Sequence, residues 1–303
     1  LRRFFFPIME KFVKEIIWGK KEMNKFYIIT RYSFRRSVWA IIGWGIPLML
    51  LGIITIPFYD LVAENERQLR PVLENLKPLV KSFIGGDEAE QIFTPEGFIS
   101  LRYFAFLPVI LGIYGSVSGS GLLAADEERG ILDFVLAHPV SRGQLFWGRV
   151  ISFTASLSCI IGLGWLGLWI GVAKAGSMNF PPFQLLLPYL SVFAVTWFFA
   201  CFSLALSMCV PSRSSAAMIS GILVLAGYII TTLAKAIKGL ENWAVFSPLT
   251  YYQSNAMMGF EIVPFIKLFL VTLVLLFLAR IGFGLRDIRV AGDGGWKLPF
   301  IRG

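Results

Sequence analysis

The sequence has little of what catalysis and metal binding use. Its 303 residues include one histidine and three cysteines, and the spacings HExxH, CxxC and GxSxG are absent. A catalytic histidine needs a nucleophile or a carboxylate within reach, and His138 is more simply a solvated loop side chain. Cys201 and Cys209 lie eight residues apart on one predicted helix, too far to bond. A membrane-embedded enzyme thus depends on a catalytic group that the sequence does not show.

Charge is also scarce. Only 16% of the residues are charged and 56% are hydrophobic, with a mean hydropathy of +0.70, whereas soluble domains carry about 25% charge. Uncharged runs recur that are long enough to cross a hydrocarbon core of about 30 Å. They lack the alternation of a membrane barrel, so helices are the remaining choice. The sequence predicts an all-α integral membrane protein with six spans, at about 38–56, 103–125, 150–173, 183–210, 216–234 and 265–283.

The sixth span is the weakest of these predictions. Lys267 and Arg280 lie near its ends, where their side chains can snorkel to the headgroups. With six spans, both termini lie on one side, and the segments on that side carry 19 of the 28 lysines and arginines. The positive-inside rule places both termini in the cytoplasm. The net charge of +9 follows from this topology, and we expect no nucleic-acid partner.

The segments between the spans differ in character. The basic segment 1–37 is predicted as an interfacial amphipathic helix on the cytoplasmic side. The external loop 57–102 contains apolar residues at helical spacing from Leu69 to Phe83, which predicts an external amphipathic helix. The loop 235–261 reads as external, interfacial or re-entrant. No linker or repeat is visible, so we treat 1–303 as one transmembrane domain.

The predicted spans also lack deep charges. Between positions 103 and 266, no acidic or basic residue lies far inside a span, although such residues normally mark proton and ion relays. This argues against a stand-alone secondary transporter or channel, but carbonyls at broken helices could still bind sodium, so that alternative stays open. The phosphate-binding pattern GxxxxGK[ST] is missing too, so any ATP must be hydrolysed by another chain.

The predicted cytoplasmic loop 126–149 is the most informative stretch. Three acids, Asp126 to Glu128, precede a short run whose apolar face is Ile131, Leu132, Val135 and Leu136, and Pro139 ends that run. The acids suit a helix N-terminal region, and Ser141 is a plausible N-cap for the next helix. A bare apolar face on a connecting loop indicates a docking partner.

This loop resembles a known family pattern. The stretch EERGILDFVLAHPVSR is similar to E-x-x-x-G-T-L-x-x-L-L-x-x-P-V-S-R of type-two ATP-binding cassette (ABC) permeases, the membrane subunits of bacterial ABC exporters. Ile131 stands in place of the usual threonine. By this resemblance, the loop would be the coupling element that docks on a separate ATPase. The implied coupling residues are Glu127, Glu128, Arg129, Gly130, Ile131, Leu132, Val135, Leu136, Pro139, Ser141 and Arg142.

The resemblance carries further expectations. The chain itself would bind no cofactor, and ATP with Mg²⁺ would sit on the partner subunit. A second copy or a related permease would complete a dimer in the cytoplasmic membrane of a bacterium or archaeon, among its lipids, and an uncharged pathway suits an amphiphilic drug, lipid or peptide. The implied pathway residues are Gly112, Gly115, Gly119, Ser220, Gly221 and Tyr228. From the residues alone, these small side chains are equally well helix-packing positions.

Overall fold

The structure is a computed structural model that describes residues 20–68, 70–71, 93–137, 140–175, 178, 180–234, 237 and 239–285. Over these ranges the ordered elements are helices and no strand occurs. The all-α prediction is therefore confirmed. Six helices are long and apolar enough to cross a membrane, one for each predicted span. They are α3 (Val38–Glu64), α6 (Leu107–Glu128), α8 (Arg142–Lys174), α9 (Pro182–Cys209), α10 (Arg213–Ala234) and α12 (Ile262–Leu285).

Several helix ends differ from the predicted spans. Helix α3 continues eight residues past the predicted limit at 56, with Pro47 and Pro57 inside it. The second span begins earlier than predicted, because α5 (Pro95–Ile99) and the π-helix η2 (Ser100–Phe104) lead into α6. Phe98 and Phe104 are buried there, so this stretch packs into the bundle rather than forming an external loop. Hydropathy alone misses it because Arg102 interrupts the apolar run.

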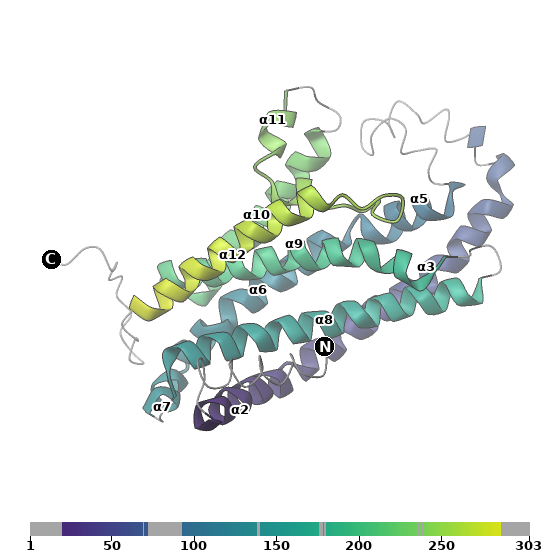
Figure 1. The fold of residues 1–303 in the computed structure, drawn as a ribbon. Coiled ribbons are helices and arrows are strands. Elements are labelled where there is room, and N and C mark those ends of the chain that lie inside the picture. Colours follow the sequence, from purple (N-terminus) through teal and green to yellow (C-terminus); the bar gives the residue numbers. More distant parts are fainter. Residues whose placement is uncertain are drawn as a thin grey trace, which may run out of the picture.

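The helices form two groups. In the first group, α2 (Lys20–Arg36) and α3 pack against α8, and in the second, α6, α10 and α12 pack against α9. The contacts between the groups are sparser, and α8 provides most of them. Figure 1 shows α12, α9 and α8 side by side, with α3 behind α8. The bundle is thus two helical units joined along a seam.

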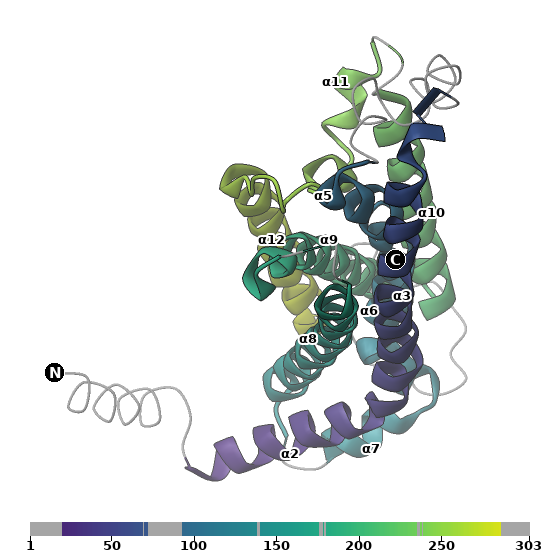
Figure 2. The same ribbon diagram turned by 90° about the vertical axis from the view of Figure 1, so that its right-hand side faces the viewer.

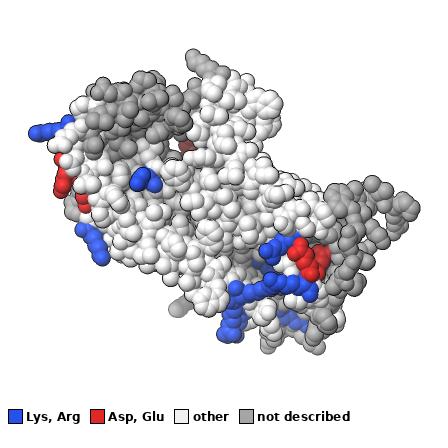
Figure 3. Space-filling view, turned by 180° about the vertical axis from the view of Figure 1, so that it is seen from behind, with Lys and Arg blue, Asp and Glu red and all other residues white. Residues whose placement is uncertain are grey.

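The two ends of the bundle are different. Helices α2 and α7 (Ile131–Ala137) lie at one end, which we call the α7 end, and α11 (Glu241–Ala244) lies at the other, the α11 end (Figure 2). Helix α2 runs across the α7 end at a steep angle to α3 (Figure 2). Charged side chains gather toward the two ends, and a broad band between them is nearly uncharged on the face in Figure 3. This is the charge distribution of a membrane-spanning bundle.

Buried tyrosines join the two groups toward the α11 end. The hydroxyl of Tyr189 on α9 donates to that of Tyr103, 2.7 Å away, and Tyr103 donates to the carbonyl of Leu48 on α3. Tyr252, which follows the short helix η3 (Pro248–Tyr251), donates to the carbonyl of Phe104. Burial raises the pKa of Tyr252 well above its usual range.

Some predicted features lie outside the described residues. These are segment 1–19 of the interfacial region, the amphipathic run from Leu69 through Phe83 apart from residues 70 and 71, and residues His138 and Pro139. The described part of segment 1–37 is the basic helix α2, whose Tyr27, Ile28 and Tyr32 are exposed. The described part of 235–261 contains only the short helices α11 and η3.

Candidate functional site

The chain turns between α6 and α7 at Arg129 and Gly130. Gly130 has φ of 67°, a left-handed conformation in which a side chain would be strained. Its amide donates to the carbonyl of Glu127, 2.9 Å away. A left-handed glycine after the last helical turn is a common helix terminator. The Gly130 that the family resemblance singled out is therefore the residue that allows α7 to fold back.

The three acids end α6 instead of starting the next helix, which corrects the sequence prediction. Carboxylates at a helix C-terminus are disfavoured by the helix dipole, so they need compensating partners. Glu128 accepts the backbone N–H of Arg213, 2.8 Å away, at the first turn of α10. The positive N-terminal end of the α10 dipole stabilises the Glu128 carboxylate there, and this offsets the unfavourable position of Glu128 at the end of α6. Glu127 is buried.

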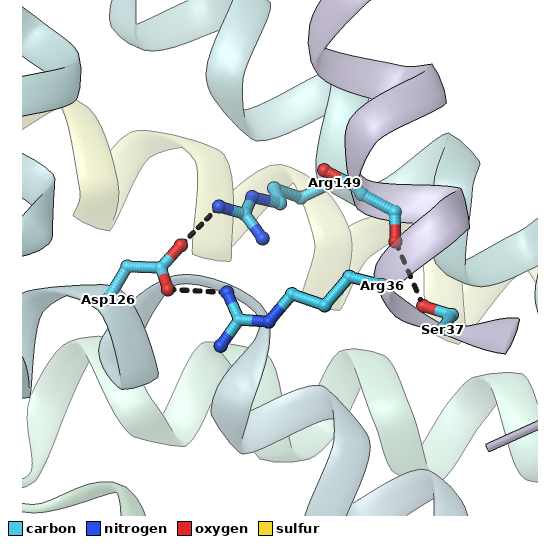
Figure 4. A network of polar contacts seen from close by, with 5 residues as sticks. Arg36, Ser37, Asp126 and Arg149 are labelled. Carbon is cyan, nitrogen blue, oxygen red and sulfur yellow. Dashed lines mark hydrogen bonds and ion pairs between the residues drawn. The ribbon is translucent and has the colours of Figure 1, made fainter. Parts of the chain in front are cut away.

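Asp126 is the centre of an ion-pair network at the α7 end. Arg36 of α2 donates to one carboxylate oxygen over 2.8 Å, and Arg149 of α8 donates to the other (Figure 4). The Asp126 side chain is 4% exposed, that of Arg149 12% and that of Arg36 39%. Three helices from both groups therefore meet at one buried carboxylate. Because the partners come from segments far apart in sequence, only the folded chain reveals this network.

The apolar face of α7 points into the protein. Leu132 is 2% exposed, and Val135 and Leu136 are partly buried against the main core. The expectation that this face is bare is therefore wrong for Leu132, because the turn at Gly130 folds α7 back against the bundle. Arg129 and Ile131 remain exposed. The exposed surface beside α7 is therefore the α6–α7 turn.

Ser141 is the N-cap of α8, as predicted. Its hydroxyl accepts the amide of Gln144 over 3.1 Å, and the Gln144 side chain accepts the amide of Ser141 over 3.0 Å. This is a capping box. Arg142 donates to the carbonyls of Phe283 and Gly284 in the last turn of α12, over 3.3 and 3.2 Å. Arg142 thus ties the end of loop 126–149 to the last span, where a cation is favoured by the helix dipole.

The predicted pathway glycines lie at helix contacts within the chain. A Cβ on Gly115 would come within 2.5 Å of the carbonyl oxygen of Thr196, and one on Gly119 within 2.1 Å of that of Ala200. On Gly112 it would meet Val224 of α10 at 3.2 Å. Glycine here lets α6 approach α9 and α10 closely, so the packing alternative describes these three positions inside the chain.

The other predicted pathway residues lie on α10. Ser220 is fully buried, and its hydroxyl is 2.7 Å from that of Ser116 on α6. Tyr228 is partly buried against the second core cluster, whereas a Cβ on Gly221 would meet nothing within 4 Å. Of the four predicted pathway glycines, only Gly221 therefore has open space beside it.

The residues that sequence reasoning missed are Arg36 and Arg149. Both belong to the basic segments that flank the predicted spans, and a basic residue at a span end carries the same signal whether it faces headgroups or a carboxylate. Asp126 was read as one of three helix-starting acids. Its position directly after the predicted apolar span 103–125 was the one available hint that it is buried.

No group of His, Cys, Asp and Glu among the described residues has the arrangement of a metal site. The described part of the chain is a bundle of six candidate spans with a folded charged turn at one end. These features define a multi-pass membrane protein.

The sequence comparison identifies the family. A model for the ABC-2 family transporter protein matches residues 29–279, so the chain belongs to the ABC-2 transporter family. Members of this family are the membrane components of ABC transporters, and membership implies association with an ATP-binding subunit. The comparison with curated proteins gave no match.

Proposed function

We propose that this chain is the permease subunit of an ABC exporter in the cytoplasmic membrane of a bacterium or archaeon. In this proposal a separate cytoplasmic subunit binds ATP and Mg²⁺ and drives export of an amphiphilic drug, lipid or peptide. Two copies, or one copy and a relative, form the transporter, and residues 1–303 act as one transmembrane domain. The carrying observation is the Asp126 network beneath the exposed α6–α7 turn.

The α7 end is the cytoplasmic end in this proposal. All six spanning helices have one end there, and those ends carry Arg36, Arg129, Arg142, Arg213 and Arg280. The positive-inside rule assigns such an end to the cytoplasm. A membrane-impermeant maleimide tests this orientation, since it should label Arg129→Cys in inside-out vesicles and Arg67→Cys in right-side-out cells. The reverse pattern would contradict the proposal.

Movement would pass through the Asp126 network. A partner that pushes on the α6–α7 turn displaces the end of α6, and the carboxylate carries that displacement to α2 and α8 through Arg36 and Arg149. Because α6 and α8 belong to different helix groups, the push shifts one group against the other along the sparsely packed seam. ATP binding would thereby change the populations of inward- and outward-facing states.

Charge reversal at the turn tests the docking. The double variant Arg129→Glu with Ile131→Asp alters two exposed side chains, so the fold should survive while the ATPase subunit no longer co-purifies. Arg67→Glu is the matched control, because Arg67 is exposed near the α11 end of α3. Equal co-purification of the ATPase with both variants would show that the turn is not the docking surface.

The alternative is a secondary transporter or channel that works alone. It would need an ion site inside the spans. Among the described residues, the buried acids are Asp126 and Glu127, and both lie at the end of α6. Their position favours a structural or coupling role over an intramembrane relay.

A further inference from the structure

A groove lies on the outer surface of the bundle where α8, α9 and α12 meet. Its volume is about 410 Å³, within the range of sites that hold small ligands. Its walls include Trp147, Thr154, Ala155 and Ser158 of α8, Trp197 of α9 and Leu276 of α12. Figure 1 shows these three helices side by side. The groove therefore follows the seam between the two helix groups and opens toward the surrounding membrane.

The groove presents hydrocarbon. Its two hydroxyl side chains are committed to bonds inside the protein: Thr154 donates to the carbonyl of Val150 over 2.9 Å, and Ser158 donates to that of Thr154 over 2.9 Å. The indole of Trp197 donates to the hydroxyl of Thr154 over 3.2 Å. With these groups satisfied, the walls offer carbon surface, which suits an acyl chain rather than a polar solute.

The groove has the depth of one leaflet. Trp147 and Ser158 lie eleven residues apart on α8, about 16 Å along a helix axis, and half of a hydrocarbon core of about 30 Å is about 15 Å. Trp147 is at the α7 end of this length, and tryptophan favours the boundary between hydrocarbon and headgroups. The groove thus runs inward from the membrane surface at the α7 end.

A cationic side chain, Arg280, lies at the α7 end of the groove. The guanidinium of Arg280 lies over the ring of Phe146, with its central carbon 5.9 Å from the ring centroid. Its Nη2 would be 3.1 Å from a Cβ on Gly143, so it lies against the first turn of α8. Arg280 is partly exposed and forms no ion pair with a carboxylate of the described residues. It is one helical turn beyond Leu276 in the direction of the α7 end.

We propose that the groove binds one anionic phospholipid, with an acyl chain along α8 and the phosphate at Arg280. An arginine binds phosphate through charge-assisted hydrogen bonds, and the groove supplies the apolar length that the acyl chain needs. Because it sits in the seam between the two helix groups, this lipid packs against both. Lipid binding at this site does not involve the partner ATPase, so its test is independent of the test of the proposed function.

Native mass spectrometry of the purified full chain tests the proposal. The protein is mixed with equal amounts of phosphatidylglycerol and phosphatidylcholine of the same acyl chains, and bound lipids are counted. We expect one phosphatidylglycerol per chain, preferred about fivefold, which is the gain expected from one arginine beside an anionic headgroup. Equal binding of the two lipids, or no retained lipid, would overturn the proposal, since the groove would then lack headgroup recognition or be covered by protein.

Paired variants locate the site. Arg280→Gln should remove the preference, while Lys267→Gln, at the other end of α12, should keep it. Ala155→Trp should fill the groove and displace the lipid, while Val274→Trp, on an exposed part of α12 outside the groove, should not. If Arg280→Gln and Ala155→Trp retain the lipid like their controls, the site is not in this groove. If either variant fails to fold, the competition on the unmodified chain decides.

Discussion

The Asp126 network gives the sharpest stability prediction, made with the substitution Asp126→Asn. Asparagine keeps the size of aspartate and one carbonyl acceptor but loses the charge. Arg149, whose side chain is only 12% exposed, then lacks its buried counter-charge. Breaking a buried pair by removing one partner costs about 3–5 kcal/mol. Because asparagine can still accept one hydrogen bond, we expect a loss of about 3 kcal/mol, at the lower end of that range.

The two arginines should differ. The side chain of Arg36 is 39% exposed, so its charge is screened by water, and Arg36→Gln should cost no more than about 1 kcal/mol. The combination Asp126→Asn with Arg149→Met removes the uncompensated charge as well. This double variant should therefore be more stable than Asp126→Asn alone.

The assay is unfolding by sodium dodecyl sulfate in mixed micelles, followed by tryptophan fluorescence. Glu64→Gln is the matched control, because Glu64 is an exposed carboxylate at the α11 end of α3, away from the Asp126 network. We expect its unfolding free energy to stay within about 0.5 kcal/mol of the unmodified chain. If Asp126→Asn behaves like this control, or like Arg36→Gln, the network does not hold the helices together.

Three further predictions concern close helix contacts and the α6–α7 turn. Gly119→Ala places a Cβ 2.1 Å from a carbonyl oxygen of α9 and should lower the unfolding free energy by about 1–3 kcal/mol, whereas Gly221→Ala has open space and should not destabilise. Gly130→Ala must adopt φ near 67°, at a cost of about 1–2 kcal/mol. A double-mutant cycle of Ser116→Ala and Ser220→Ala, joined at 2.7 Å, should give a coupling of about 1 kcal/mol. All three use the same micelle unfolding assay.

Different results would contradict each of these. Equal stability of Gly119→Ala and Gly221→Ala would mean that α6 does not approach α9 as closely as described. A neutral Gly130→Ala would contradict the left-handed turn after α6. A zero coupling in the serine cycle would show that the two hydroxyls are not bonded to each other.

The sequence predicted all six spans because their signal is local. Twenty apolar residues in succession describe a membrane helix wherever they occur, and even the sixth span, with Lys267 and Arg280 near its ends, is a helix. The helix ends were less predictable. The run from Pro95 to Phe104 contains Arg102 and reads as loop in isolation, yet it packs into the bundle through aromatic side chains.

The candidate site also had features that the sequence could predict and features that it could not. The N-cap at Ser141 was predictable because a capping box uses residues three apart. The burial of Leu132 was not predictable, because whether an apolar face is covered depends on the direction that the chain takes after Gly130. The pairing of Asp126 with Arg36 spans 90 positions, and charge patterning along the chain cannot reveal such a contact.

We propose above that this chain works with a separate ATPase through the α6–α7 turn. The direct measurement is ATP hydrolysis by the candidate ATPase subunit in proteoliposomes, with the unmodified chain and with the Arg129→Glu and Ile131→Asp double variant. We expect the unmodified chain to raise turnover and the double variant to leave it at the level of the ATPase alone, while Arg67→Glu should match the unmodified chain. Turnover that is indifferent to the presence of the chain, or to the double substitution, would contradict it.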